Sequence, residues 1–255
     1  MIKKNGCFGF LSSNTLKLLA CLFMVVDHVG FRFFPYDIGW RIVGRLAFPI
    51  FAFMIAEGAK YTKNKLRYFL TIAILAGGME AVYYILFKQV AQSIFATFAF
   101  SIIIIYTLDF LKRMIFAKDK SISLIVLGAI LFSGSITLTY FIGKSFKFDY
   151  NFGGVLLPVL ASLFRMPDSA PDFLKKLDKH PIHLAIFGAG LLAHALFANA
   201  LFSNYIQIYA LLTLPLLLLY SGKRGKLKLK YFFYIFYPSH LVLIQVIYWI
   251  INANF

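Results

Sequence analysis

Apolar runs of about 18 residues or more recur along the whole chain, and no other feature restricts the fold as strongly. An α-helix rises ~1.5 Å per residue, so a run of about 20 apolar residues can cross the ~30 Å hydrocarbon core of a bilayer. The chain is 61% hydrophobic and only 14% charged, whereas soluble domains carry about 25% charged residues. These features predict an all-α fold, a polytopic transmembrane helix bundle surrounded by the lipid bilayer.

Hydropathy predicts about nine membrane spans, which we assign to a single transmembrane domain over residues 1–255. The sixth predicted span is too short to cross the hydrocarbon core upright. We expect it to be a half-helix, or to be extended by the DYNFGG sequence at its start. The predicted spans cover residues 16–34, 40–60, 68–87, 94–111, 121–141, 152–164, 182–198, 205–220 and 231–251.

The positive charge of the chain lies in clusters between the predicted spans. The formal net charge is +16, but a nucleic-acid interface needs a continuous basic face on a soluble surface. Lysine and arginine instead gather in the loops that alternating spans would place on one side of the membrane, which is the positive-inside pattern. We therefore predict a cytoplasmic N-terminus, an extracytoplasmic C-terminus and no nucleic-acid partner.

The first two predicted spans carry more ionisable side chains than an inert anchor needs. They hold Asp27, His28, Arg41, Arg45 and Glu57. A charged group at membrane depth is energetically unfavourable, so it tends to face a protein interior or a wet cavity and to serve a function. We therefore expect a functional site in this part of the chain.

His28 and His240 are the two candidates for a general base. The pKa of histidine lies near neutrality, so an imidazole can take the proton of an attacking amine or hydroxyl. Because adjacent helical residues point about 100° apart, His28 can face a cavity while Asp27 caps a neighbouring helix or pairs with an arginine. His240 follows Pro238, which interrupts helical hydrogen bonds and permits a polar cavity, so it is a second candidate for the base or a donor to a substrate carbonyl. A histidine hydrogen-bonded at a helix end is the structural alternative.

Arg41 and Arg45 lie four residues apart and therefore share one helix face near the outer end of the second predicted span. Two guanidinium groups there would hold an anion such as a phosphate, a pyrophosphate or a carboxylate. The alternative is structural: the pair only neutralises Asp27 and other carboxylates, or reaches to lipid headgroups.

Glu57 lies about 18 Å farther along the same predicted span, by the helical rise. It would bind the polar part of a cofactor, or it would pair with Lys60 or Lys17. No His-x-x-x-His sequence and no Cys/His pair with ligand spacing occurs in the chain. We therefore predict no metal ligands.

Four stretches together carry a resemblance to a known family. They are LKLLACLFMVVDHVG, WRIVGRLAFPIFAFMIAEGAKYTKNKLRYFL, DYNFGGVLLPVLASLFR and KYFFYIFYPSHLVL. On these stretches the chain resembles the TraX family of integral membrane proteins, which includes the pilin N-terminal acetylase of conjugation systems. That family is also distantly similar to the acyltransferase 3 membrane enzymes, whose first helix places a histidine where the acceptor is activated.

The resemblance implies a membrane-embedded acetyltransferase that uses acetyl-CoA as acyl donor and a histidine as general base. Carried over by position, the base and its partner would be His28 and Asp27, with His240 as the second candidate. Acetyl-CoA would bind at Arg41, Arg45, Glu57 and Lys17. The cavity for the acceptor would be lined by Asp149, Tyr150 and Tyr237.

The acceptor implied by the resemblance is an amine or a hydroxyl, on a peptide such as a pilin N-terminus or on a glycan. The implied location is a bacterial inner or cytoplasmic membrane, as a multi-pass protein. A different reading of the same residues is a small-molecule transporter or channel, in which the buried charges form a substrate or proton pathway. A third is a non-catalytic assembly partner in a secretion or pilus machine.

Overall fold

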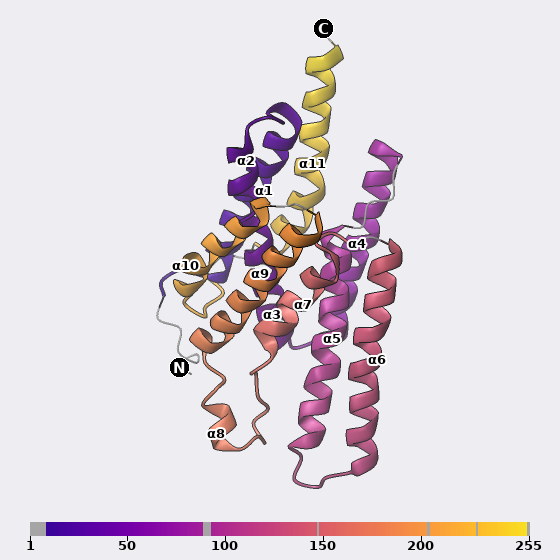
Figure 1. Cartoon of the computed structure of the whole chain (residues 1–255), viewed down its shortest axis with the longest axis vertical. Helices are drawn as coiled ribbons and strands as arrows, with labels where there is room; N and C mark the ends of the chain where they lie inside the picture. Colours follow the sequence, from indigo (N-terminus) through magenta and orange to yellow (C-terminus); the bar gives the residue numbers. More distant parts are fainter. Residues whose placement is uncertain (1–8, 89–92, 147, 203–204, 228, 254–255) are drawn as a thin grey trace. The chain divides into compact units, whose positions relative to one another are not determined.

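The computed structural model describes residues 9–88, 93–146, 148–202, 205–227 and 229–253. These residues are mostly helical, and they contain no β-strand beyond an isolated bridge between Leu11 and Tyr220. The predicted all-α fold is therefore confirmed for the described residues. In chain order (Figure 1) the elements are α1 (Ser13–Phe33), α2 (Ile38–Gly44), α3 (Ala47–Tyr61), α4 (Lys65–Phe87), α5 (Ile94–Ile115), α6 (Ile122–Phe146), α7 (Asn151–Ser162), α8 (Asp172–Lys175), α9 (His180–Phe202), the 3₁₀-helix η1 (Tyr205–Leu212), α10 (Thr213–Leu218) and α11 (Lys230–Ala253).

Six segments among the described residues are long and apolar enough to cross a membrane, by length and composition. Two shorter apolar segments, Asn151–Ser162 and Tyr205–Leu218, fall on the sixth and eighth predicted spans. Helix α1 forms over the first predicted span but is not among the six. The count of nine spans, and with it the orientation of the two termini, stays a prediction. The six segments are Ile38–Tyr61, Lys65–Leu86, Ile94–Ile115, Ile122–Phe146, His180–Ala200 and Tyr231–Asn252.

The second predicted span is one apolar segment but two helices, α2 and α3, and this differs from the continuous helix that we expected. Pro49 lies in the first turn of α3, and a proline ring clashes with the carbonyl of the residue four positions earlier. That residue is Arg45, where α2 ends. Arg41 therefore lies in a short separate helix whose C-cap residue is Arg45, and Glu57 belongs to the next helix.

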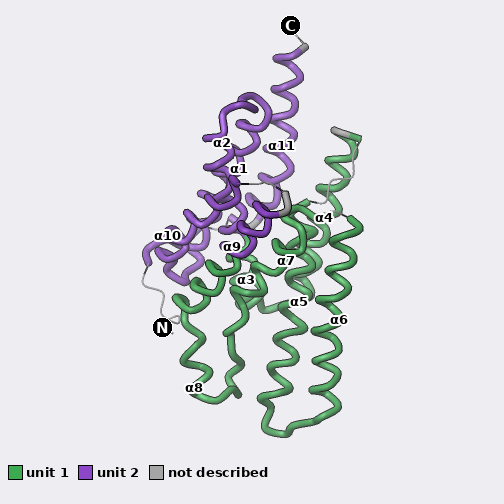
Figure 2. The backbone as a smooth tube through the Cα atoms, viewed as in Figure 1, with its two compact units in different colours: residues 1–6, 52–190 green, residues 7–51, 191–255 purple. Residues whose placement is uncertain are grey.

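The helices divide into two compact units, which Figure 2 shows in different colours. Among the described residues, unit 1 lies within residues 52–190, and unit 2 lies within residues 9–51 and 191–253. Helices α3 and α9 each contribute residues to both units. The assignment of residues 1–255 to one domain stays a prediction.

In unit 2, α1 packs against α2 and against α11 (Figure 1). Helix α1 begins where the Ser12 side chain accepts a hydrogen bond from the Thr15 backbone N–H, which satisfies one of the unpaired N-terminal donors. Gly30 allows a close approach of α2, because a Cβ at this position would lie 2.1 Å from the Cβ of Trp40. Small residues at such contacts are typical of membrane helices, where close van der Waals packing replaces the hydrophobic effect.

In unit 1, α5 is the central helix and packs against α4, α6 and α7. Its buried Ile104 and Ile105 contact Val155 and Val159 of α7 in one apolar cluster. Helix α5 is also tied to α7 by a hydrogen bond of 2.8 Å from the Ser101 hydroxyl to the Val155 carbonyl oxygen. The helix is therefore fixed by both apolar packing and a buried polar contact.

Candidate functional site

The two histidines that the sequence singled out contact each other in unit 2. His28 lies on α1 and His240 lies on α11, and their ring centroids are 5.1 Å apart at an interplanar angle of 72°. His240 is buried, with 5% of its surface exposed, whereas His28 is half-buried. The tertiary structure therefore joins the two candidate bases into one pair.

Hydrogen bonds within each helix fix which ring nitrogen is available. The Nδ1 of His28 lies 2.7 Å from the Met24 carbonyl oxygen, and the Nδ1 of His240 lies 3.0 Å from the Phe236 carbonyl oxygen. Because a carbonyl oxygen can only accept, each Nδ1 carries the hydrogen and each neutral ring has its lone pair on Nε2. The Nε2 of His240 is buried and has no hydrogen-bond partner among the described residues. Both rings therefore present Nε2 as the atom that can take a proton.

Aromatic residues of α11 surround the second histidine. The ring of Phe236 stacks on His240 with centroids 5.2 Å apart and planes within 8°. The ring of Tyr237 meets His240 edge-on at 5.5 Å, which places this predicted cavity residue beside the histidine pair. The Ser239 hydroxyl instead donates to the Ile235 carbonyl oxygen of its own helix. Helix α11 continues through Pro238 without ending.

Asp27 is held by both predicted arginines. Arg41 Nη1 lies 3.0 Å from Asp27 Oδ2, and Arg45 Nη2 lies 2.9 Å from Asp27 Oδ1. Of the two roles that we considered for Asp27, the structure shows arginine pairing rather than capping of a neighbouring helix. Two guanidinium groups face one carboxylate, so the cluster carries a formal charge of +1. The binding of a further anion by these arginines stays a prediction.

Gly44 permits this ion-pair cluster to form. A Cβ at Gly44 would lie 2.0 Å from Asp27 Oδ1 and 2.3 Å from Asp27 Cβ, far inside van der Waals contact. The glycine between Arg41 and Arg45 therefore allows α2 to approach α1 closely enough for both arginines to reach one carboxylate. The R-x-x-G-R sequence of α2 thus has a physical explanation in the contact with Asp27.

The variant Gly44→Ala is expected to lower the free energy of unfolding by about 1–3 kcal/mol, because the added methyl group overlaps Asp27. The thermal unfolding midpoint of the purified protein in detergent measures this effect. Gly78 of α4 provides a matched control, since a Cβ there would meet nothing within 4 Å. Alanine favours a helix over glycine by about 1 kcal/mol, so Gly78→Ala should leave stability unchanged or raise it. Equal behaviour of the two variants would contradict the prediction.

A second contact between α1 and α11 was not predicted from the sequence. The Arg32 guanidinium donates a hydrogen bond to the Gln245 side-chain oxygen, and it lies 5.1 Å from the ring centroid of Tyr248. Arg32 lies in the last turn of α1. Gln245, like His240, is a buried polar residue in the apolar helix α11, and a polar side chain within an apolar run was the signal that could have identified it.

The remaining residues of the predicted acetyl-CoA site have other contacts. Glu57 forms an ion pair with Arg165 in unit 1, and Lys60 pairs with Asp178. Lys17 lies on α1 in unit 2, with its Nζ 5.8 Å from the ring centroid of Phe233. Glu57 and the two arginines of α2 thus belong to different units. Their common role as a donor site stays a prediction.

Asp149 and Tyr150 precede α7 in unit 1, whereas Tyr237 belongs to unit 2. The Asp149 carbonyl oxygen accepts a hydrogen bond of 3.1 Å from the Thr97 hydroxyl. Tyr150 has φ +60° and Asn151 has φ +53°, in the left-handed region that a bulky residue such as tyrosine rarely adopts. Such strain is found preferentially at functional sites. The role of Asp149 and Tyr150 in substrate binding stays a prediction.

Unit 1 contains a buried polar cluster that the sequence did not identify. Lys112 Nζ donates to three backbone carbonyl oxygens at and beyond the end of α7, at 2.7–3.2 Å. Asp178 accepts hydrogen bonds from Lys60 Nζ and from His183 Nε2, at 3.1 Å and 2.8 Å. The sequence showed these residues only as separate loop and span charges. Their grouping depends on how α3, α5, α7 and α9 pack within unit 1.

Asp178 lies in the segment before α9, outside the candidate spans. Burial by itself would raise its pKa, but the hydrogen bond from His183 and the positive charge of Lys60 outweigh it and lower the pKa from 3.8 to about 2. Because the folded-state pKa is depressed, this carboxylate stabilises the fold above about pH 4, and the contribution disappears as the pH falls toward 2.

The variant Asp178→Asn is therefore expected to be less stable than the wild type by on the order of 2 kcal/mol near pH 6. The difference should narrow as the pH is lowered from about 4 to about 2. Thermal unfolding midpoints of both proteins across this range measure the effect. A difference that stays constant down to pH 2 would show that the carboxylate charge at Asp178 is not the stabilising feature.

Among the described residues, no group of three or more His, Cys, Asp or Glu side chains is placed to hold a metal ion. The candidate site of unit 2 thus consists of an imidazole pair beside a cluster of one carboxylate and two guanidinium groups. Such a site offers proton transfer at Nε2 and positive charge near a reacting group. It suits acid–base chemistry at a carbonyl.

Two known proteins are similar to this chain in sequence. The chain is 29% identical over 247 residues to the probable fimbrial assembly protein FimC, serogroup H1, of Dichelobacter nodosus, an alignment that covers 91% of this chain and 94% of that protein. The uncharacterized protein RP591 of Rickettsia prowazekii (strain Madrid E) is 38% identical over 77 residues, which cover 30% of this chain and 29% of that protein. No solved structure matches the chain.

A family-wide comparison gives the broadest match. The model of the TraX protein family covers residues 12–248, a range that includes α1, α2 and both histidines of the pair. The resemblance seen in the sequence motifs is therefore confirmed. The chain belongs to the TraX family.

Proposed function

We propose that this protein is a membrane-embedded acetyltransferase that moves an acetyl group from acetyl-CoA to an amine or hydroxyl acceptor. The observation that supports the proposal most is the contact between His28 and His240, whose rings lie 5.1 Å apart with Nδ1 of each bound to a carbonyl oxygen. Membership of the TraX family supports the same activity. The fimbrial assembly name of one relative makes a pilin-type peptide amine the first acceptor to test.

In the proposed reaction the nitrogen or oxygen of the acceptor attacks the carbonyl carbon of the acetyl thioester. The new C–N or C–O bond forms, the C–S bond breaks, and the Nε2 of His28 takes the proton of the attacking atom. That proton then passes to the departing CoA thiolate, which leaves as a thiol and restores the neutral imidazole. No oxidant, reductant or metal is needed for this balance.

We assign the base to His28 and a positioning role to His240. His28 is the half-buried member of the pair, so an acceptor can reach it, whereas His240 is only 5% exposed. The edge-to-face contact of the two rings and the stacking of His240 on Phe236 hold the imidazole of His28 from one side. A fixed ring with a defined tautomer is the state that a general base requires.

The ion-pair cluster next to His28 in the chain supplies the electrostatic part of the proposal. Asp27, Arg41 and Arg45 together carry a formal charge of +1. Positive charge near the carbonyl oxygen stabilises the oxyanion that develops in acyl transfer, an effect typically worth about 3–4 kcal/mol per donor. Asp27 in this arrangement orients the two guanidinium groups and lowers the net charge of the cluster.

Acetyl-CoA is an anionic substrate, and unit 2 contains basic side chains that suit its phosphate groups. Lys17 lies eleven residues before His28 on α1, which corresponds to about 16 Å along the helix. We propose that the phosphates of the substrate lie toward Lys17 and that its acetyl end lies toward His28. Arg41, whose side chain is 29% exposed, is the more accessible of the two arginines for a further anionic contact.

The test uses the wild-type protein in lipid nanodiscs with labelled acetyl-CoA and two peptides that differ only in whether the N-terminal amine is free or formylated. The expected result is binding of acetyl-CoA, and release of free CoA thiol that rises with the free-amine peptide. Thiol release without a peptide effect would redirect the search to hydroxyl acceptors. Absence of acetyl-CoA binding would overturn the proposal, and flux into proteoliposomes without a donor would then test the transporter alternative.

A further inference from the structure

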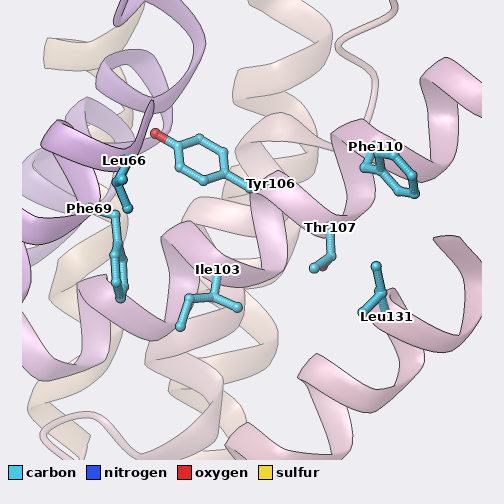
Figure 3. Close-up of a pocket in the computed structure, with 7 residues that line it drawn as sticks. All are labelled: Leu66, Phe69, Ile103, Tyr106, Thr107, Phe110 and Leu131. Atoms are coloured by element: carbon cyan, nitrogen blue, oxygen red, sulfur yellow. The ribbon is translucent and has the colours of Figure 1, made fainter. Parts of the chain in front are cut away.

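An apolar groove runs along α5 between α4 and α6, wholly within unit 1 (Figure 3). It has a volume of about 350 Å³. Its floor is formed by Ile103, Thr107 and Phe110 of α5, and its sides by Leu66 of α4 and Leu131 of α6. The floor extends about 10 Å from Ile103 to Phe110 by the helical rise, a large part of the ~15 Å depth of one hydrocarbon leaflet.

The helices that flank the groove face outward in unit 1. Only 11% of the residues in the apolar windows of α4 and of α6 are buried, compared with 56% for α5. Leu66 and Leu131 are 66% and 44% exposed. Helices this apolar and this exposed contact acyl chains when they cross a bilayer, so the groove is open to lipid.

One end of the groove is cationic. Arg113 lies three residues after Phe110 on the same face of α5, in its last turn, and its side chain is exposed. Arg67 is exposed next to Leu66 on α4. No described residue pairs with the guanidinium group of either arginine. Guanidinium groups suit the bidentate recognition of a phosphate.

Asp109, which precedes Phe110 on α5, does not cancel this charge. Asp109 Oδ2 lies 3.2 Å from Lys65 Nζ, so the carboxylate is already neutralised by a lysine. The same Lys65 Nζ lies 4.6 Å from the ring centroid of Tyr106, a residue that lines the groove. The rim therefore holds one ion pair without net charge and two further arginines, Arg67 and Arg113. Its net positive charge favours the binding of an anion.

We propose that the groove binds one anionic phospholipid, with an acyl chain along Ile103, Thr107 and Phe110 and the headgroup phosphate at Arg113 and Arg67. The apolar lining excludes a soluble polar ligand, and the arginines at one end favour an anionic over a zwitterionic headgroup. Each arginine near an anionic lipid is worth about a fivefold change in binding. This inference does not depend on the proposed acetyltransferase activity.

Native mass spectrometry of the full chain in detergent tests the proposal with two lipids of identical acyl chains, a phosphatidylglycerol and a phosphatidylcholine. The wild type is expected to retain phosphatidylglycerol at least about fivefold more strongly. The variant Arg113→Gln should reduce this preference about fivefold, whereas Arg224→Gln, which removes an exposed arginine of unit 2, should not. The variant Leu131→Trp should block the groove and release the bound lipid, whereas Ile130→Trp at the adjacent exposed position of α6 should not.

Three outcomes would overturn the proposal. The first is equal retention of the two lipids by the wild type, and the second is unchanged retention by Leu131→Trp. The third is a wild-type dimer that Leu131→Trp converts to a monomer, which would show that a second copy of the chain covers the groove. A circular dichroism spectrum of each variant checks that the helices are intact, and Arg113→Gln tests the headgroup contact without changing the apolar lining.

Discussion

Replacement of His28 by alanine is expected to lower the rate of acetyl transfer by about 10²- to 10⁴-fold, the usual contribution of a general base. The reason is that the Nε2 of His28 is the proton acceptor in the proposed reaction, and His28 is the more exposed of the two paired histidines. The measurement is release of CoA thiol under saturating acetyl-CoA, with substrate binding measured separately. Binding should persist while turnover is lost.

Two further variants, His240→Ala and His194→Ala, distinguish the role of His28 from that of the other histidines. His240 positions the ring of His28, so its loss should lower turnover less than the loss of His28 and should leave acetyl-CoA binding intact. His194 lies on α9, outside the pair, and serves as the matched histidine control whose loss should leave turnover unchanged. Full activity of a folded His28→Ala protein would show that His28 is not the general base. A complete loss confined to His240→Ala would transfer the role to that histidine.

Replacement of Asp27 by asparagine is expected to destabilise the protein by about 3–5 kcal/mol, the usual result of removing one partner from a largely buried ion pair. The Asp27 side chain is 14% exposed and that of Arg45 is 12% exposed. The variant removes the carboxylate charge that both guanidinium groups contact. The thermal unfolding midpoint in detergent, supported by a titration with denaturing detergent, measures the change.

Two further variants distinguish this ion-pair effect from a general effect of the substitution. Asp119→Asn makes the same chemical change at an exposed position between α5 and α6 and should alter stability by less than about 0.5 kcal/mol. The double variant Asp27→Asn with Arg45→Gln removes one of the unpaired charges and should recover part of the lost stability. Strict additivity of the two single effects would contradict a direct Asp27–Arg45 interaction.

Much of the secondary structure could be predicted from the sequence because hydropathy and helix signals are local. The all-α fold, the helix over the first predicted span and the shortness of the sixth were readable in this way. The break between α2 and α3 has a local signal in Pro49, whose ring disfavours a helix that continues back through Arg45. However, Pro158 and Pro238 lie inside α7 and α11, so a proline alone does not predict a break. Hydropathy does not distinguish one continuous helix from two consecutive ones.

The chemical content of the candidate site was also visible in the sequence, but only as separate residues. Ionisable groups at membrane depth are costly, and this alone singled out Asp27, His28, Arg41 and Arg45. The residue types limited each one to a few roles, such as base, anion ligand or ion-pair partner. Arginine pairing was among the alternatives for Asp27, and the structure selected it because Gly44 brings α2 against α1.

The sequence by itself determined that this is a helical membrane protein of the TraX family with ionisable groups in its first two predicted spans. Only the tertiary structure decided that His28 and His240 form a pair, that Glu57 pairs with Arg165, and that Lys112 binds the end of α7. The physical reason is that hydropathy and helix propensity depend on neighbours along the chain. Contacts between residues of distant helices depend instead on how those helices pack in space.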